Sequence, residues 1–311
     1  MARLYAGVDG GGTRTRAVVT GADLVPMGRG ASGPANASTT PLARVVEAIL
    51  EAVDDALAAA GSSPEDLAAL SCGIAGVEGS GSTERLVAEL SAEYPGTKIV
   101  VSTDARVALE GAFDGVSKTG IVLVAGTGAV ALGRNAAGDE ARAGGWGPLF
   151  GDEGSAYSIA VKGLAAVVRD LDGRGEPTRI RALLFASEPE RSFRELVSRL
   201  YQGVASPADV AAYFPLVAKA ARQEDAVARQ ILGDAGQELA LAALAVARRL
   251  SLEGETFPVA TVGGVFTAGE LVLATLRERL LREAPGARLG PPAFPPEIGA
   301  IRLVLQKENP S

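Results

Sequence analysis

Two short loops of glycine and threonine carry the clearest chemical potential in this sequence. They are Asp9-Gly10-Gly11-Gly12-Thr13 and Gly126-Thr127-Gly128, one near the start of each half of the chain. Each lies between two strand-like apolar segments, so each is expected to form a hairpin turn that exposes main-chain N–H groups. Converging N–H groups bind anions, and phosphate is their usual ligand. The two turns therefore predict two lobes that hold a polyphosphate.

The first loop differs from a P-loop, because it lacks the Gly-Lys-Ser/Thr ending and a strand follows it. Its functional interpretation is that the main chain and the Thr13 hydroxyl contact phosphate, while Asp9 holds Mg²⁺ directly or through water. The alternative is a glycine-rich hairpin turn without a ligand. The presence of a second loop of the same kind favours the functional interpretation.

Asp104 follows the strand-like segment KIVVST and precedes a helix-like segment. A carboxylate at the carboxyl end of a strand in an open sheet lies where ligands bind. It could therefore act as a general base that takes a proton from a substrate hydroxyl. It could equally be the N-cap of the helix, a position that aspartate fills well. The two roles are compatible, and the sequence leaves both open.

The segment Gly144-Gly145-Trp146-Gly147-Pro148 is followed closely by Gly151-Asp152-Glu153-Gly154 and contains the single tryptophan of the chain. A carboxylate accepts hydrogen bonds from sugar hydroxyls and an indole offers an apolar wall, so this segment favours a sugar site. The alternative is a buried tryptophan beside an acidic helix N-terminus.

Two further motifs are ambiguous. Gly263-Gly264 follows the strand-like VATV and could receive adenine or ribose, although a plain strand-to-helix turn explains it nearly as well. Asn36 could bind substrate, but asparagine is a routine turn residue and the turn is preferred.

A third motif is rejected. It has the glycine spacing of a dinucleotide-binding loop, at Gly28, Gly30 and Gly33, but Pro34 follows at once and no helix begins there. Dinucleotide binding is therefore not predicted.

The elements around these motifs alternate between strands and helices, which predicts an α/β fold with a mostly parallel sheet. Hairpins are expected at 4–20 and 120–134, helices near 41–60, 82–93 and 105–113, strands at 67–76 and 98–103, and a turn-rich segment at 25–39. Helices dominate from 155 to 253. We expect an N-terminal lobe at 1–116, joined by a returning C-terminal segment at 295–311, and a C-terminal lobe at 117–294.

The composition of the chain limits the classes of protein to which it can belong. With 311 residues and 47% hydrophobic residues, the chain can build two domains with substantial cores. A net charge of −7 argues against nucleic-acid partners. No apolar run is long enough for a membrane span, so no membrane association is expected. One cysteine and no secretory signal predict a cytoplasmic location, and the absence of histidine makes a carboxylate the expected general base.

Together the motifs resemble the actin-like sugar kinase and ATPase superfamily, and within it the BadF/BadG-type ATPase family that includes N-acetylglucosamine kinase. The matching segments lie in the family's order over nearly the whole chain. They are GVDGGGTRTRAVV, STDARVALEGAF, VLVAGTGAVALG, GGWGPLFGDEGSAY and VGGVF. The resemblance implies an actin-like, ribonuclease H-like duplicated fold with a nucleotide cleft between two lobes. It also implies ATP and Mg²⁺ as cofactors and a homodimer.

The resemblance implies a role for each motif: phosphate contacts from Gly11, Gly12, Thr13 and Thr127, a catalytic base at Asp104, sugar contacts from Asn36, Gly145, Trp146 and Asp152, and adenosine contacts from Gly263 and Gly264. The expected reaction is ATP-dependent phosphorylation of N-acetylglucosamine or glucosamine, at O6. Ala129 stands where the family's N-acetylglucosamine kinases tend to carry serine, which puts the identity of the sugar in doubt. A kinase for another hexose and a regulatory ATPase that activates a protein partner are the alternatives.

Overall fold

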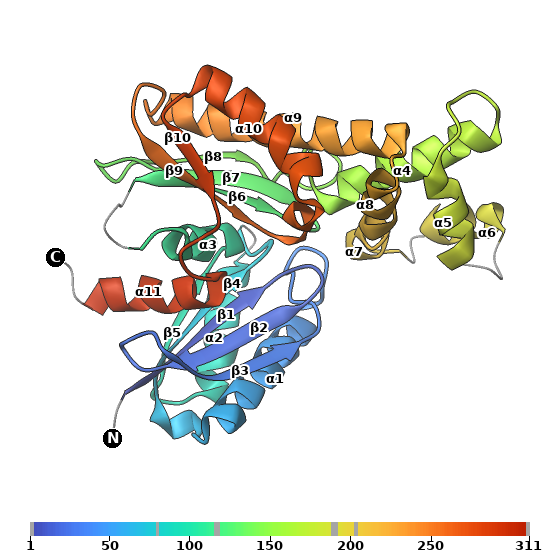
Figure 1. Cartoon of the computed structure of the whole chain (residues 1–311). Helices are drawn as coiled ribbons and strands as arrows, with labels where there is room; N and C mark the ends of the chain where they lie inside the picture. The colour runs from blue at the N-terminus through green and yellow to red at the C-terminus, as the bar shows by residue number, and fades with distance from the viewer. Residues whose placement is uncertain (1–2, 79–80, 115–118, 188–191, 202–204, 309–311) are drawn as a thin grey trace. The chain divides into compact units, whose positions relative to one another are not determined.

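The computed structural model describes residues 3–78, 81–114, 119–187, 192–201 and 205–308 (Figure 1). The chain divides into two compact units. Unit 1 comprises Met1–Lys118 together with Pro291–Ser311, and unit 2 comprises Thr119–Gly290. The domain boundary predicted between residues 116 and 117 lies outside the described residues.

Each unit contains a five-stranded sheet, and the two sheets have the same topology. In unit 1 the strand order is β3-β2-β1-β4-β5, and in unit 2 it is β8-β7-β6-β9-β10 when read in the same direction. In both sheets the first three strands along the chain are antiparallel neighbours, and the last two add in parallel. This repeated arrangement confirms the duplicated α/β fold that the resemblance implied. The expectation of a mostly parallel sheet is wrong, because the hairpin strands make half of the neighbouring pairs in each sheet antiparallel.

The strands of unit 1 are β1 (Leu4–Gly10), β2 (Thr15–Thr20), β3 (Pro26–Ser32), β4 (Leu67–Ile74) and β5 (Lys98–Ser102). Its helices are α1 (Leu42–Ala60), the short η1 (Pro64–Asp66), α2 (Ser82–Glu93), α3 (Asp104–Ala112) and α11 (Pro296–Glu308).

Successive side chains of a strand point to opposite faces of its sheet, and β1 shows how this builds the layers of unit 1. Leu4, Ala6 and Val8 belong to the core shared with α1 and α2. Tyr5 packs with Ile298 and Ile301 of α11 on the other face. Asp9 follows the same alternation as Tyr5, so its carboxylate belongs to the face that α11 covers.

Strand β3 corrects the expectation of a turn-rich segment at 25–39. It pairs with β2 from Pro26 to Ser32 at the edge of the sheet. A Cβ atom at Gly28 would lie 2.1 Å from the Ala56 oxygen, and one at Gly30 would lie 2.0 Å from the Ala52 oxygen. These glycines therefore allow α1 to lie directly on β3, a packing role that resembles turn composition when seen only in the sequence.

The strands of unit 2 are β6 (Gly120–Ala125), β7 (Ala129–Arg134), β8 (Glu140–Gly144), β9 (Phe257–Val262) and β10 (Ala287–Gly290). Its helices are α4 (Ala156–Leu171), α5 (Arg179–Ser187), α6 (Phe193–Tyr201), α7 (Pro207–Ala211), α8 (Phe214–Arg222), α9 (Ala226–Arg249), η2 (Gly264–Ala268) and α10 (Glu270–Glu283).

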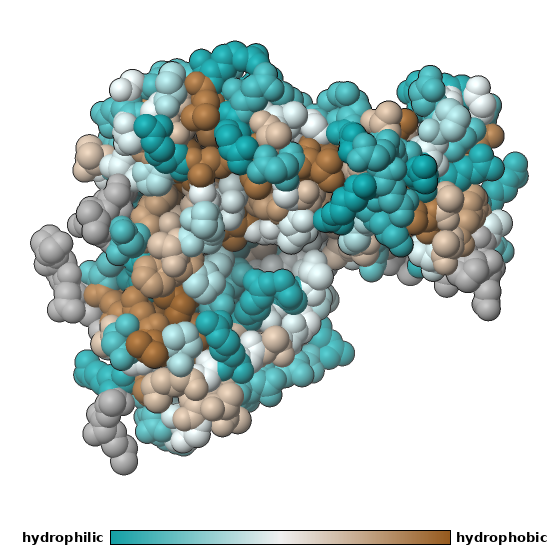
Figure 2. All heavy atoms as spheres, in the orientation of Figure 1, coloured by the Kyte–Doolittle hydropathy of each residue, from teal (hydrophilic) through white to brown (hydrophobic). Residues whose placement is uncertain are grey.

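One hydrophobic core joins the sheet of unit 2 to its helices. Ile121 and Leu123 of β6 pack with Leu239 and Leu244 of α9 and with Leu276 of α10, all nearly inaccessible to solvent. Figure 2 shows hydrophilic and hydrophobic side chains interspersed on the visible surface. Among the described helices, none is both long and apolar enough to cross a membrane.

Candidate functional site

Three carboxylates of unit 1 gather at the carboxyl end of β1, and each is placed there by a different element. Asp9 is the penultimate residue of β1, Asp104 opens α3, and Glu297 lies in the first turn of α11. Both Asp104 and Glu297 are near enough to Asp9 for their negative charges to act on it. The sequence indicated Asp9 and Asp104, but Glu297 was missed because nothing nearby in the sequence marks it as a site residue.

The electrostatic environment of Asp9 opposes its ionisation. Burial of its side chain, followed by the charges of Asp104 and Glu297, raises its pKa to about 7. Arg16 lies opposite Asp9 on β2 and lowers the pKa of Asp9. Its guanidinium Nη1 is 3.9 Å from the Asp9 Oδ2 atom, so the opposing effect is modest.

This excess of negative charge fits a divalent cation. Among the residues that the structure describes, no group of three acidic, histidine or cysteine side chains is arranged to hold a metal alone. Mg²⁺, however, is usually held by one or two carboxylates together with phosphate oxygens and water. Asp9 is the side chain that would hold Mg²⁺ here, and the ion would neutralise phosphate charge.

The loop after Asp9 is a tight turn whose first amide is already used. The Gly11 N–H donates to the Arg14 oxygen over 3.1 Å, and the Gly11 oxygen accepts from the Ala35 N–H. A Cβ atom on Gly11 would meet only the Arg14 oxygen, at 3.7 Å. Thr13 is exposed at the tip of the loop. The contact with Ala35 places Asn36 beside this loop.

Asn36 forms a local turn, as its alternative interpretation expected. Its Oδ1 atom accepts hydrogen bonds from the Ser38 N–H at 2.9 Å and from the Ser38 hydroxyl at 2.7 Å. This turn fixes the side chain beside the first glycine loop and leaves the amide nitrogen as the group considered for a ligand.

The helix-capping role considered for Asp104 belongs to its neighbour. Thr103 is the N-cap of α3, and its hydroxyl accepts from the Arg106 N–H at 3.1 Å. Asp104 is the first helical residue, and its Oδ1 atom accepts from the Ala105 N–H at 2.9 Å. The side chain is partly exposed. Asp104 is therefore not the N-cap of α3, although its carboxylate still accepts one amide of the first turn.

The second glycine loop joins β6 to β7 at the carboxyl end of β6. The Gly126 N–H donates to the Gly128 oxygen at 2.9 Å, so this amide is used within the turn. The oxygens of Gly126 and Thr127 accept from the Ala156 and Tyr157 N–H groups, which belong to the first turn of α4. The turn is thus attached to the start of a helix, which fixes its position.

Asp152 contacts this turn directly through its carboxylate. Its side chain is 7% exposed, and its Oδ1 atom accepts from the Ala129 N–H at 3.2 Å. A Cβ atom on Gly128 would lie 2.9 Å from the Asp152 Oδ2 atom. Burial raises the pKa of Asp152, and the Ala129 hydrogen bond opposes that shift. Its φ of 62° is strained for a residue with a side chain, which is typical of functional positions.

Gly145 and Trp146 follow β8 near the same turn. Arg142, which the sequence analysis missed, donates from Nη2 to the Gly145 oxygen at 2.7 Å and thereby holds this segment. A Cβ atom on Gly145 would lie 3.1 Å from Val130 in β7. Trp146 is 78% exposed, and Leu149 and Phe150 in the same loop are exposed as well. The indole is therefore accessible to a ligand instead of buried.

The glycine pair after β9 lies beside the second loop, because β9 and β6 are parallel neighbours. Gly263 has a φ of 119°, and a Cβ atom there would lie 2.2 Å from the Ala125 oxygen, so the fold itself requires this glycine. Gly126 and Gly264 are different: among the described residues, a Cβ atom on either would have no neighbour within 4 Å. Glycine at these two positions fits a ligand that approaches the main chain closely.

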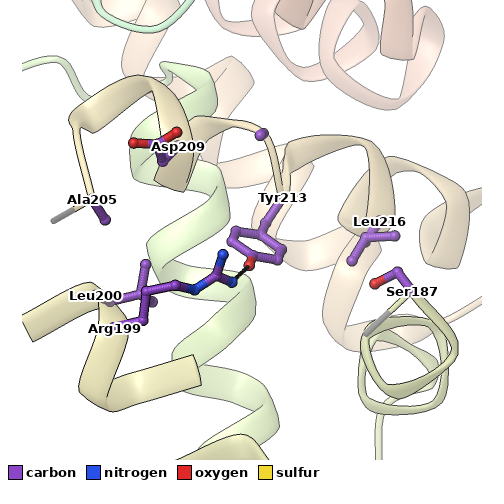
Figure 3. Close-up of a pocket in the computed structure, with 8 residues that line it drawn as sticks. Ser187, Arg199, Leu200, Ala205, Asp209, Tyr213 and Leu216 are labelled. Carbon is purple, nitrogen blue, oxygen red and sulfur yellow. Dashed lines mark hydrogen bonds between the residues drawn. The ribbon is translucent and has the colours of Figure 1, made fainter. Parts of the chain in front are cut away.

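A cavity of about 460 Å³ lies elsewhere, among helices α5 to α8 of unit 2 (Figure 3). Arg199 and Tyr213 line it, and the Arg199 Nη2 atom donates to the Tyr213 hydroxyl at 2.8 Å. No residue that the sequence analysis singled out lines this cavity. Ser187 and Ala205 at its edge border segments outside the described residues.

The duplicated sheets and their paired loops define the class of this protein as an actin-like α/β fold of the kind found in sugar kinases and ATPases. A family model for the BadF/BadG/BcrA/BcrD ATPase family matches residues 6–303. The chain belongs to this family.

Three similar proteins have names that describe amino-sugar kinases. An N-acetylmuramic acid/N-acetylglucosamine kinase from Clostridium acetobutylicum is 32% identical over 83% of this chain and 84% of its own length. An N-acetyl-D-glucosamine kinase from Dictyostelium discoideum is 28% identical over 98% of this chain and 99% of its own. The crystal structure of a candidate N-acetylglucosamine kinase from Chromobacterium violaceum is similar with a TM-score of 0.78 and 29% identity, over 98% of this chain and 99% of that one.

The raised pKa of Asp9 predicts a pH-dependent stability. Between the ordinary value of 3.8 and about 7, the folded protein binds a proton at Asp9 that the unfolded chain has released. This contribution is complete below pH 3.8 and disappears as the pH rises through 7. Asp9→Asn should remove up to roughly 4 kcal/mol of this pH dependence. The measurement is urea unfolding of the metal-free proteins from pH 4 to 8. If the unfolding free energies of wild type and Asp9→Asn changed equally with pH, the raised pKa of Asp9 would be contradicted.

The two kinds of glycine predict opposite outcomes for substitution by alanine. Gly126→Ala and Gly264→Ala should leave the unfolding free energy within about 1 kcal/mol of wild type but weaken ATP binding roughly tenfold, since the new methyl group occupies ligand space. Gly263→Ala should instead destabilise the fold by roughly 1–3 kcal/mol. Thermal unfolding and nucleotide titration separate the two effects. Unchanged ATP affinity in the first two variants would argue against a nucleotide at these positions.

Proposed function

We propose that this protein transfers the γ-phosphoryl group of ATP to an amino sugar, N-acetylglucosamine or glucosamine, at O6, with Asp104 as the general base. The chain is a sugar kinase by its family and by named kinase relatives that align over most of its length. The position of the acceptor hydroxyl and the identity of the base are the parts that this proposal adds.

One observation carries the role of Asp104: it stands at the carboxyl end of the sheet while Thr103 performs the capping. In the proposed reaction the sugar hydroxyl oxygen forms a bond to the γ-phosphorus, and the bond to the bridging oxygen of ADP breaks. The hydroxyl proton passes to the Asp104 carboxylate. Positioning and charge stabilisation supply most of the rate in phosphoryl transfer, and proton acceptance adds about 10²–10⁴-fold.

The other proposed ligand contacts are described for each unit in turn. In unit 1, Gly11, Gly12 and Thr13 are proposed phosphate contacts, and Asp9 is the proposed Mg²⁺ ligand. In unit 2, we assign phosphate contacts to the Gly126–Gly128 turn and adenosine contacts to Gly263 and Gly264. The absence of a Cβ neighbour at Gly126 and Gly264 supports these assignments.

Sugar contacts are proposed for Asn36 in unit 1 and for three residues of unit 2, namely Gly145, Trp146 and Asp152. The exposed indole supports a stacking role for Trp146. Asp152 has one oxygen engaged by the Ala129 amide, so a sugar hydroxyl would use the other. Ala129 offers no hydroxyl, so one polar contact to the sugar is expected to be missing. The proposal also includes a homodimer in the cytoplasm, as the family resemblance implies.

A substrate panel tests the proposed function. ADP release is measured with ATP, Mg²⁺ and glucose, glucosamine, N-acetylglucosamine, mannose or N-acetylmuramic acid, and mass spectrometry of the product places the phosphate. The expected outcome is sugar-dependent ADP release that is fastest with an amino sugar and a phosphate at O6. Slow ADP release that no sugar changes would support a regulatory ATPase instead.

Asp104 and Thr103 form a matched pair for testing the base. Asp104→Asn should lower kcat by about 10²–10⁴-fold, or roughly 3–5 kcal/mol of transition-state stabilisation, with ATP affinity little changed. Thr103→Ala removes the helix cap and should lower the unfolding free energy by about 1 kcal/mol while keeping most of kcat. Retention of more than about a tenth of kcat in Asp104→Asn would rule out a general base at this position.

A further inference from the structure

Glu297 is a buried carboxylate that the proposed reaction leaves without a task. It lies in the first turn of α11, and the residue is 3% exposed. Its main-chain oxygen lies against β1, since a Cβ atom on Gly7 would be only 1.9 Å from it. The close approach of the two backbones brings the acidic start of α11 to the strand that carries Asp9.

The two oxygens of the Glu297 carboxylate have different surroundings. Oε1 accepts from the Arg29 Nη1 atom at 3.1 Å, and this forms an ion pair with a side chain of β3. Oε2 is enclosed and has no hydrogen-bond donor among the described residues. A buried acceptor without a donor costs about 1–3 kcal/mol, and more when it is charged. Such an atom is usually retained only where it serves a ligand, an ion or an ordered water.

The charge of Glu297 is favoured locally but disfavoured by its neighbours. The Arg29 guanidinium and the amide end of α11 both stabilise a negative charge at this position. Asp9, on the same face of the sheet, is repelled by it. The balance changes when a divalent cation is bound at Asp9, because the repulsion is then replaced by attraction through a poorly solvated interior.

We propose that Glu297 is an outer-sphere residue of the divalent-cation site at Asp9. It adds a buried negative charge behind Asp9 and an unoccupied acceptor oxygen toward the hydration shell of the ion, without coordinating the ion itself. This inference rests on the proposed function, in which nucleotide brings a divalent cation to Asp9. Glu297 acts through Asp9, so it is a positioning residue and takes no part in proton transfer.

Because Glu297 and Arg29 carry opposite charges, their substitutions are expected to change the cation affinity in different ways. Glu297→Gln keeps the shape of the side chain and removes its charge, so it should weaken cation binding by about tenfold or more, as supporting groups of metal ligands commonly do. Arg29→Gln removes a positive charge from the same ion pair and should leave the affinity unchanged or increase it. Because Arg29 is more than half exposed, Glu297→Gln leaves no buried charge behind, whereas Arg29→Gln leaves the buried Glu297 carboxylate without its cation.

A buried acid outside this cluster supplies the control. Glu110 of α3 is 4% exposed, and it pairs with Arg106 at 3.2 Å and accepts from Gln306 at 3.1 Å. Glu110→Gln therefore removes a buried charge of the same unit without touching Asp9, and it should change cation affinity by less than about threefold, an effect below 1 kcal/mol.

The measurement is the dissociation constant of Mn²⁺ in the presence of ATP and the absence of sugar, from electron paramagnetic resonance of free Mn²⁺. Weaker binding in Glu297→Gln together with equal or tighter binding in Arg29→Gln supports the proposal. An affinity within about twofold of wild type in Glu297→Gln overturns it. If Glu297→Gln does not fold, Glu297→Met, which also removes the charge at similar side-chain length, is measured against the same thresholds.

This outcome is separable from that of the proposed function. The titration contains no sugar and records no turnover, whereas the substrate panel depends on both. A protein that bound Mn²⁺ and ATP through Asp9 and Glu297 but phosphorylated no sugar would remove the kinase proposal and leave the role of Glu297 standing.

Discussion

The main chain of α11 lies directly against β1, and this contact exists only because residue 7 has no side chain. A methyl group at Gly7 would collide with the Glu297 oxygen and with Ile301. The same strand places Asp9 two residues further on, on the face that α11 covers. The proximity of Glu297 to Asp9 is therefore a consequence of backbone packing, and the apolar contacts of Tyr5, Ile298 and Ile301 hold α11 on β1.

The two units differ in the charged side chains that surround their glycine loops. Unit 1 concentrates acidic side chains where β1 ends, and arginines of β2 and β3 offset them only in part. Unit 2 instead presents a turn that is fixed by the first amides of α4 and supported by the Asp152 carboxylate beneath it. The first arrangement suits a cation and the second suits a ligand that must be positioned, which are complementary requirements of a nucleotide bound with its metal ion.

Much of this organisation follows from local pattern in the sequence. The alternation of strands and helices predicted an α/β fold, and both glycine loops lie in hairpins at the carboxyl ends of strands, as expected. Strand β3 was missed because Gly28 and Gly30 have the composition of a turn, whereas their actual role is to admit α1. Glu297 and Arg142 were missed for a related reason: their significance comes from partners distant in sequence, and no local spacing encodes such contacts.

Unit 1 is assembled from two stretches of chain separated by the whole of unit 2. The strand that carries Asp9 precedes unit 2 in the chain, whereas the helix that shields Tyr5 and Val18 follows it. During synthesis the sheet of unit 1 therefore stays open on one side until unit 2 has been made. Removal of α11 would uncover the apolar surface formed by Tyr5 and Val18, so a chain that lacks this helix is expected to self-associate.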